Sequence, residues 1–165
     1  MDARIDYTKL SPEPVTALLA LGRYVAGCGL EYPLLELVKV RASQINGCAF
    51  CLDMHTQDAR AAGETEQRLY ALNAWRETPF FTARERAALA WAEAVTLAAG
   101  GVPDATFEEA RRQFSERELA DLTWAVVAIN GWNRLNVAFR TMPGAYKPHL
   151  RAQLEAQLTG SPVRN

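Results

Sequence analysis

Two cysteines three positions apart, followed by a histidine, are the residues of this sequence best suited to chemistry. Cys48 and Cys51 come directly after the turn-forming pair Asn46-Gly47, and His55 lies four positions beyond Cys51. A helix that begins at about Cys48 places the three side chains on one face, because residues three and four apart are neighbours on a helix. The positive end of that helix favours a thiolate over a thiol. The segment therefore predicts an activated thiol at Cys51 that exchanges a proton with His55, with Cys48 close enough to form a disulfide.

The same residues allow two other interpretations. Free cysteines are often buried, so Cys48 and Cys51 also fit a packing role. A structural zinc site needs four ligands, and only Cys28 and His149 are candidates for the fourth, both distant in the sequence. Cys28 is most simply a packing residue and His149 a surface residue. We therefore expect no metal and no cofactor.

The elements that must position these residues are helices. Apolar residues recur at spacings of three and four along the chain, and no long segment alternates apolar with polar residues, so we predict an all-α fold. Start signals are Ser11-Pro12 and the capping boxes Thr82 with Glu85 and Ser115 with Glu118. We expect helices from Ser11-Pro12 to Gly27 or Gly29, from Pro33 to Asn46-Gly47, from Cys48 to Gly63, from Glu66 to Ala74, from Thr82 to Gly100-Gly101, from Asp104 to Phe114, from Ser115 toward Phe139 with Pro143-Gly144 closing it, and from Pro148 to Leu158.

Length and composition narrow the class of protein. The chain has 165 residues, 49% of them hydrophobic, and a net charge of −1. These values predict a single domain over residues 1–158 with a flexible tail over 159–165, and they argue against nucleic-acid binding. The apolar run from Val15 to Leu30 contains Gly22 and Arg23, so it is no membrane span. The acidic N-terminus is unlike a signal peptide, and we expect a cytoplasmic protein.

The residues singled out above resemble the alkylhydroperoxidase D and carboxymuconolactone decarboxylase superfamily. Its signature is a Glu followed by Cys-x-x-Cys-x-x-x-His, and Glu36, Cys48, Cys51 and His55 fit it in order and spacing. The resemblance extends through residues 43–47 and 129–134, and covers about residues 10–145.

The resemblance implies an alkylhydroperoxidase D-like helical fold packed around the cysteine helix, and a thiol-dependent peroxidase. Cys51 would reduce the hydroperoxide, Cys48 would resolve the sulfenic acid, and Glu36 with His55 would relay the proton. A dithiol or thioredoxin-like donor would supply electrons. Phe50 departs from the family pattern, because some members carry a histidine next to the second cysteine. Decarboxylases of the superfamily lack the cysteine pair, which argues against lactone chemistry.

Some assignments stay open on the sequence alone. Glu36 with Lys39 three positions later is also typical of a solvated helix face. The helices that carry Trp91 and Trp124 are too apolar to be covered within one protomer, which predicts a homo-oligomer, and the resemblance points to a trimer or hexamer. We expect three residues to shape the interior near the site or a subunit contact: Asn130, Trp132 and Asn133. The alternative function is a non-catalytic redox sensor or metal-binding oligomer that uses the same residues.

Overall fold

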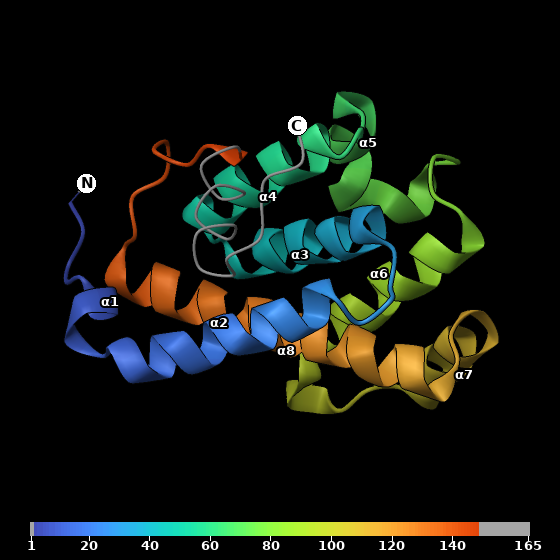
Figure 1. Cartoon of the computed structure of the whole chain (residues 1–165). Helices are drawn as coiled ribbons and strands as arrows, with labels where there is room; N and C mark the ends of the chain where they lie inside the picture. Colours follow the sequence, from blue (N-terminus) through green and yellow to red (C-terminus); the bar gives the residue numbers. More distant parts are fainter. Residues whose placement is uncertain (1, 149–165) are drawn as a thin grey trace.

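The computed structural model describes residues 2–148, which form helices and contain no strand (Figure 1). The all-α prediction is confirmed. No helix in this part of the chain combines the length and the apolar composition that crossing a bilayer requires. The predicted helix from Pro148 to Leu158, the tail over 159–165 and His149 lie outside the described residues, and the single domain over 1–158 stays a prediction. The helices are α1 (Tyr7–Leu10), α2 (Pro12–Ala26), α3 (Tyr32–Asn46), α4 (Ala49–Ala61), α5 (Glu66–Ala71), η1 (Leu72–Glu77), α6 (Ala83–Thr96), η2 (Ala98–Gly100), α7 (Asp104–Gln113) and α8 (Glu116–Phe139).

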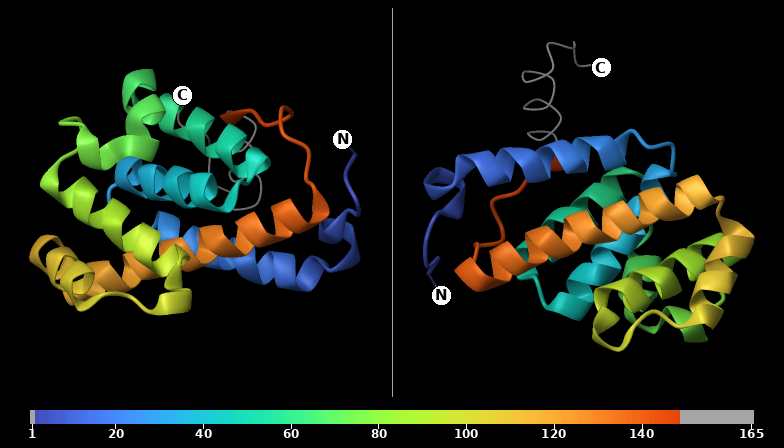
Figure 2. Two further views of the ribbon diagram at one scale, coloured as in Figure 1. Left: turned by 180° about the vertical axis from the view of Figure 1, so that it is seen from behind. Right: turned by 90° about the horizontal axis from the view of Figure 1, so that it is seen from below.

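Helix α3 lies at the centre of the fold and packs against α4, α6 and α8. Its sequence explains this position, because Leu34, Leu35, Leu37, Val38 and Val40 point to several sides of the helix and all are buried. A helix that is apolar on most of its circumference must be covered by neighbours. Helices α2 and α8 run alongside each other, and α7 packs on α6 (Figure 2). The central helix thereby contacts every layer that surrounds the cysteine segment.

The turn between α3 and α4 is set by Gly47. Its φ of 64° lies in the left-handed region, and its N–H donates to the Gln44 and Ser43 carbonyls at the end of α3. Cys48 N–H also donates to Ser43 O, at 3.1 Å. Glycine adopts this conformation without the steric cost that other residues meet. The predicted Asn46-Gly47 boundary is confirmed, and it starts α4 directly beside α3.

The helix ends follow the predicted signals in most places. Both capping boxes are present, with Thr82 and Ser115 accepting from the backbone three residues on. The helix expected from Cys48 to Gly63 runs from Ala49 to Ala61, with Cys48 as its N-cap. Ser11 makes no side-chain cap to α2, which begins instead with Pro12. Strong local signals therefore located the starts of these helices to within about two residues.

Four details differ from the sequence-based expectation. The helix expected from Thr82 to Gly100-Gly101 ends at Thr96, and Ala98–Gly100 form the separate 3₁₀ turn η2. The segment expected as one helix over 66–74 divides into α5, which ends at Ala71, and the 3₁₀ turn η1, inside which the backbone at Ala74 is not helical. Helix α8 ends at Phe139 with Arg140 left-handed, before Pro143-Gly144 is reached. The four-residue helix α1 is too short to show a periodicity, and Asp6 caps it by accepting from Thr8 N–H.

The two tryptophans of the oligomer argument have different environments. Trp91 is buried within the protomer, its indole N–H donates to Thr123 Oγ1 at 3.0 Å, and its ring lies 6.1 Å from that of Phe107. Trp91 itself therefore gives no support to the prediction that its helix needs a second protomer to cover it. Trp124 on α8 is 50% exposed, and Val127 one turn further along is 44% exposed.

The N-terminal segment is fastened to the end of α8. Arg4 N–H donates to Phe139 O at 2.9 Å, and its guanidinium donates to Ala138 O at the same distance. The Tyr7 ring lies 5.5 Å from that of Phe139. These contacts place α1 beside the last turns of α8 (Figure 1).

We predict that Gly47→Ala lowers the free energy of unfolding by about 1 kcal/mol, because alanine pays a steric cost at positive φ. No atom lies within 4 Å of the added Cβ, so the effect reports backbone conformation alone. Urea unfolding measures it. Gly22→Ala is the matched control, because Gly22 lies inside α2 with the same open space, and this change should stabilise by roughly 0.5–1 kcal/mol. Equal changes in the free energy of unfolding in Gly47→Ala and Gly22→Ala would contradict the prediction.

Candidate active site

Cys48 and Cys51 lie at the first turn of α4 and are joined in a disulfide, with their Cα atoms 5.4 Å apart. Cys48 is the N-cap, and its sulfur accepts the backbone N–H of Cys51 at 3.3 Å. Both residues are buried and share a small core cluster with Ala42 and Ile129. The sulfur atoms therefore sit at the positive end of α4, as the spacing predicted.

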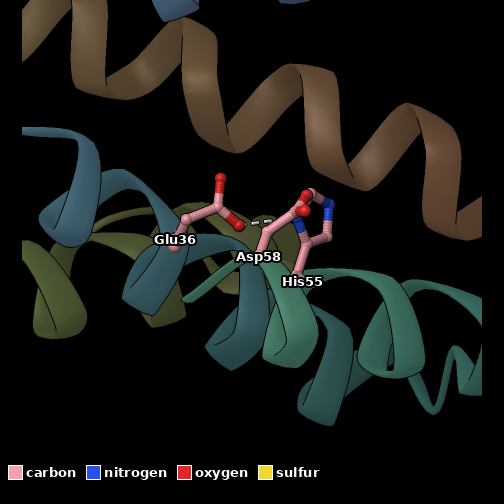
Figure 3. Close-up of side chains that lie close together, drawn as sticks. All are labelled: Glu36, His55 and Asp58. Atoms are coloured by element: carbon pink, nitrogen blue, oxygen red, sulfur yellow. Dashed lines mark hydrogen bonds and ion pairs between the residues drawn. The ribbon is translucent and has the colours of Figure 1, made fainter. Parts of the chain in front are cut away.

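Glu36 and His55 meet between α3 and α4, one turn along α4 from Cys51 (Figure 3). Glu36 Oε2 lies 2.8 Å from His55 Nδ1, and Glu36 Oε1 accepts from Lys39 Nζ at 2.7 Å. Glu36 is fully buried, so the interpretation that it lies on a solvated helix face is wrong. The ion pair with Lys39 that this interpretation expected is nevertheless present. The structure thus brings a carboxylate and an imidazole together beneath the cysteine turn.

The electrostatics of this pair fix the roles of its atoms. Burial opposes ionisation of Glu36, but the hydrogen bond and charge of His55, together with Lys39, hold its pKa at about 2. Burial lowers the pKa of His55, against the opposing effect of Glu36. At neutral pH the carboxylate is therefore ionised and accepts Nδ1–H from a neutral imidazole. Nε2 of His55 then carries the lone pair and can accept a proton.

The metal hypothesis finds little support in the donor set. Cys48 and Cys51 are bonded to each other, and Cys28 packs against a different core cluster. Within residues 2–148, the atoms of Glu36, His55 and Asp58 do come within 4.8 Å of one another. Both Glu36 oxygens already accept hydrogen bonds, one of them from the cation of Lys39. Both carboxylate oxygens of Glu36 are therefore engaged in hydrogen bonds. A metal ion bound there would be repelled by the positive charge of Lys39.

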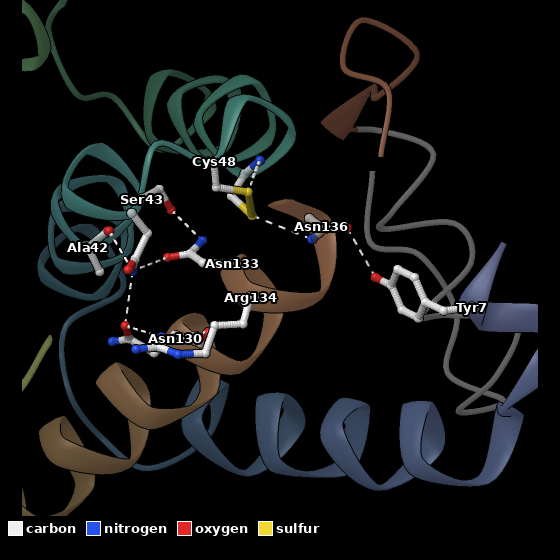
Figure 4. Close-up of a disulfide and its surroundings, with 10 residues drawn as sticks. Tyr7, Ala42, Ser43, Cys48, Asn130, Asn133, Arg134 and Asn136 are labelled. Carbon is white, nitrogen blue, oxygen red and sulfur yellow. Dashed lines mark hydrogen bonds between the residues drawn. A yellow bond between two sulfur atoms is a disulfide. The ribbon is translucent and has the colours of Figure 1, made fainter. Parts of the chain in front are cut away.

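Polar side chains of α8 complete the surroundings. Asn46 Nδ2 donates to Asn130 Oδ1 and Asn133 Oδ1, each at 2.9 Å, and Asn133 Nδ2 donates to Ser43 Oγ at 3.0 Å. These bonds tie α3 to α8 next to the cysteine turn (Figure 4). The prediction that Asn130 and Asn133 hydrogen-bond in the interior near the site is confirmed. Trp132 is partly buried.

Four residues near the site were not anticipated. Asn136 Nδ2 donates to Cys51 Sγ at 3.5 Å, and Tyr7 OH donates to Asn136 Oδ1 at 3.0 Å. Tyr146 OH donates to Asp58 Oδ1 at 2.5 Å. Asn136 continues the spacing of three set by Asn130 and Asn133, and this pattern on an apolar helix is a signal that could have located it. The other three depend on contacts between distant segments.

A surface cavity of about 460 Å³ lies on another side of α4. Its lining includes Leu52 and Thr56, which neighbour the buried Cys51 and His55 in sequence but face a different direction. Phe50 is half-buried and packs against the cysteine cluster. The cavity therefore does not open directly onto the disulfide.

Comparison with known proteins gives this arrangement a family. The carboxymuconolactone decarboxylase family model matches residues 12–94. The chain is 41% identical over 139 residues to the uncharacterized protein YdfG of Bacillus subtilis, covering 84% of this chain and 95% of that protein. The chain therefore belongs to the carboxymuconolactone decarboxylase family, within the superfamily that includes alkylhydroperoxidase D.

Solved structures share the fold. A protein of Agrobacterium tumefaciens, of unknown function and considered a candidate antioxidant defence protein AhpD, is 46% identical with a TM-score of 0.84, covering 88% of this chain and 100% of that one. An uncharacterized peroxidase-related protein of Silicibacter is 28% identical with a TM-score of 0.73, covering 82% and 72%. The expected alkylhydroperoxidase D-like fold is confirmed.

We predict that Glu36→Gln flattens the acid side of the stability profile. The folded pKa of about 2 lies below the ordinary 4.5, so the stabilisation by ionised Glu36 is complete above pH 4.5 and is lost as the pH falls toward 2. Glutamine does not ionise, and the free energy of unfolding should fall less steeply between pH 5 and 2. Urea unfolding at a series of pH values measures this. Glu108→Gln, on the exposed surface of α7, is the control and should keep the wild-type slope. A wild-type slope in Glu36→Gln would contradict the assignment.

Proposed function

We propose that this protein is a thiol-dependent peroxidase that reduces hydroperoxides through Cys48 and Cys51. The Cys51 thiolate attacks the terminal oxygen of the hydroperoxide, the O–O bond breaks, and the alkoxide takes a proton and leaves as an alcohol. Cys51 is then a sulfenic acid. The Cys48 thiolate attacks its sulfur, forms the disulfide and releases the oxygen as water. A dithiol or thioredoxin-like donor returns two electrons and two protons and regenerates both thiols.

The observation that carries the proposal is the buried pair of Glu36 on α3 and His55 on α4, the helix whose first turn holds the cysteines. Glu36 holds Nδ1–H of His55, which leaves Nε2 as the base that takes the Cys51 proton. The imidazolium formed in this way can return the proton to the leaving alkoxide. Position 50 is Phe and not His, so among residues 2–148 His55 is the only imidazole that could take part in this relay.

The relatives support the same class of reaction. The Silicibacter protein is called peroxidase-related, and the Agrobacterium protein is considered a candidate for antioxidant defence. The cysteine pair distinguishes this chain from the decarboxylases of the superfamily, which by the resemblance described above lack it. A cytoplasmic location fits the proposal, because reducing dithiol systems keep thiols reduced there.

We also propose that the protein acts as a homo-oligomer, a trimer or hexamer. Trp124 and Val127 lie one turn apart on α8, and each is close to half exposed. Adjacent apolar side chains exposed on one helix face are typical of subunit contacts. The buried environment of Trp91 removes it from this argument.

Cys51→Ser should abolish hydroperoxide consumption, because it removes the attacking sulfur. Cys48→Ser should reduce one equivalent and then stop with Cys51 trapped as sulfenic acid, since no resolving thiol remains. A peroxide assay with added dithiol measures the turnover of Cys51→Ser, and a single-turnover assay without dithiol, followed by a sulfenic-acid probe, measures the trapping in Cys48→Ser. Cys28→Ser is the control, because Cys28 packs in another cluster, and it should keep wild-type turnover. Wild-type turnover in Cys51→Ser would refute the assignment, and a wild-type protein that forms the disulfide without turnover would favour the redox sensor.

Sedimentation velocity at micromolar concentration should give a mass several times the 18.3 kDa of one chain. Trp124→Lys should shift the distribution toward the monomer, because it places a charge in the proposed contact. Tyr70→Lys is the control, since Tyr70 is exposed on α5 away from α8. A wild-type monomer of 18.3 kDa would rule out the oligomer.

A further inference from the structure

The sulfur of Cys51 has an amide partner that the relay does not use. Asn136 Nδ2 donates to Cys51 Sγ at 3.5 Å from the facing side of α8 (Figure 4). Asn136 is buried, so water does not compete for this bond. Its other end accepts from Tyr7 OH at 3.0 Å. A chain of two hydrogen bonds therefore runs from α1 through α8 to the sulfur.

Tyr7 donates to one end of the amide, and the other end then faces the sulfur, which as a disulfide or a thiolate only accepts hydrogen bonds. A side-chain amide has a donor end and an acceptor end, and turning it by 180° exchanges them. Burial raises the pKa of Tyr7, and the charge of Asp6 acts in the same direction, so the hydroxyl keeps its proton at neutral pH. A hydroxyl that donates to Oδ1 leaves Nδ2 to point at Cys51. The ring is held by its contact with Phe139.

We propose that Asn136 stabilises Cys51 as a thiolate through Nδ2, and that Tyr7 is a positioning residue that holds the amide in the required orientation. A thiolate is a stronger acceptor than a thiol or a disulfide sulfur, so the bond strengthens when the disulfide is reduced. A hydrogen bond made preferentially to the charged form favours that form. The bond therefore favours the thiolate and makes the disulfide easier to reduce.

The other titratable groups near Cys51 come from different elements. Cys48 is the N-cap of α4, and α4 itself contributes His55 with Asp58 beside it. Helix α3 contributes Glu36 with Lys39, and α1 contributes Tyr7. From α8 the buried polar side chains facing this region are the uncharged amides Asn133 and Asn136. The effect of Asn136 adds to that of His55 and depends on neither the Glu36 charge nor a hydroperoxide. The inference concerns the site of the proposed peroxidase, but thiolate formation can be measured without that reaction.

The first test measures the pH midpoint of Cys51 alkylation in a Cys28→Ser, Cys48→Ser background, where Cys51 is the remaining thiol. Asn136→Leu should raise the midpoint by about one unit, which corresponds to the loss of one hydrogen bond to a charged acceptor. Asn136→Asp should raise it further, because it places a negative charge beside the sulfur. Tyr7→Phe keeps the ring and should give a smaller rise. Tyr70→Phe is the matched control, because this exposed hydroxyl contacts Glu66, and it should give no shift.

The second test uses the intact cysteine pair and measures the equilibrium with reduced and oxidised glutathione. Asn136→Leu should move the exchange constant several-fold toward the disulfide, and Tyr7→Phe should move it in the same direction. If Asn136→Leu does not fold, Tyr7→Phe decides both measurements. Midpoints and exchange constants equal to those of the parent proteins would overturn the inference and assign Asn136 a purely structural role. If Asn136→Leu raises the alkylation midpoint but the wild-type protein consumes no hydroperoxide, the inference is supported and the proposed peroxidase function is overturned.

Discussion

The buried carboxylate of Glu36 constrains the arrangement of the whole helical core. Moving a carboxylate out of water costs several kcal/mol, and the cost is recovered only with well-placed partners. Lys39 supplies one from the same helix and His55 supplies the other from α4. Because both oxygens are used, α3 and α4 must pack in one register. A slip of either helix would leave a buried charge without its partner, so a single ion group ties the apolar centre of the fold to the cysteine helix.

The turn between these helices fixes where the sulfur atoms lie relative to the Glu36–His55 pair. Gly47 reverses the chain within one residue, so the N-terminus of α4 begins beside the C-terminus of α3. Cys48 then occupies the cap position, and its sulfur meets a backbone N–H. Cys51 lies inside the first turn, where it faces α8. The two sulfur atoms therefore have unlike environments although they are three residues apart, and an unequal pair can divide the tasks of attack and resolution.

The sequence predicted what local physics determines. Helix caps, the Asn46-Gly47 turn and the alignment of Cys48, Cys51 and His55 depend on residues within one or two turns of each other. Glu36 could not be decided by spacing, because a Lys39 partner is compatible with a solvated face and with a buried pair. The burial of Trp91 depends on Phe107 and Thr123 from other helices. The contact of Asn136 with Cys51 joins residues 85 positions apart, and that of Tyr7 with Asn136 joins residues 129 apart.

The asparagines of α8 divide into two kinds by what they bind. Asn130 and Asn133 meet Asn46 and Ser43 of α3, whose charge does not change when the cysteines are oxidised or reduced. Asn136 meets the sulfur that we propose becomes a thiolate on reduction. Within the described residues every buried side-chain nitrogen and oxygen has a partner, so the surrounding network has no unpaired group that would drive it to rearrange. Under the proposal made above, the free energy of that bond to sulfur changes with the redox state while the hydrogen bonds around it involve no sulfur, which is the condition for a rigid site to favour one state of its thiol.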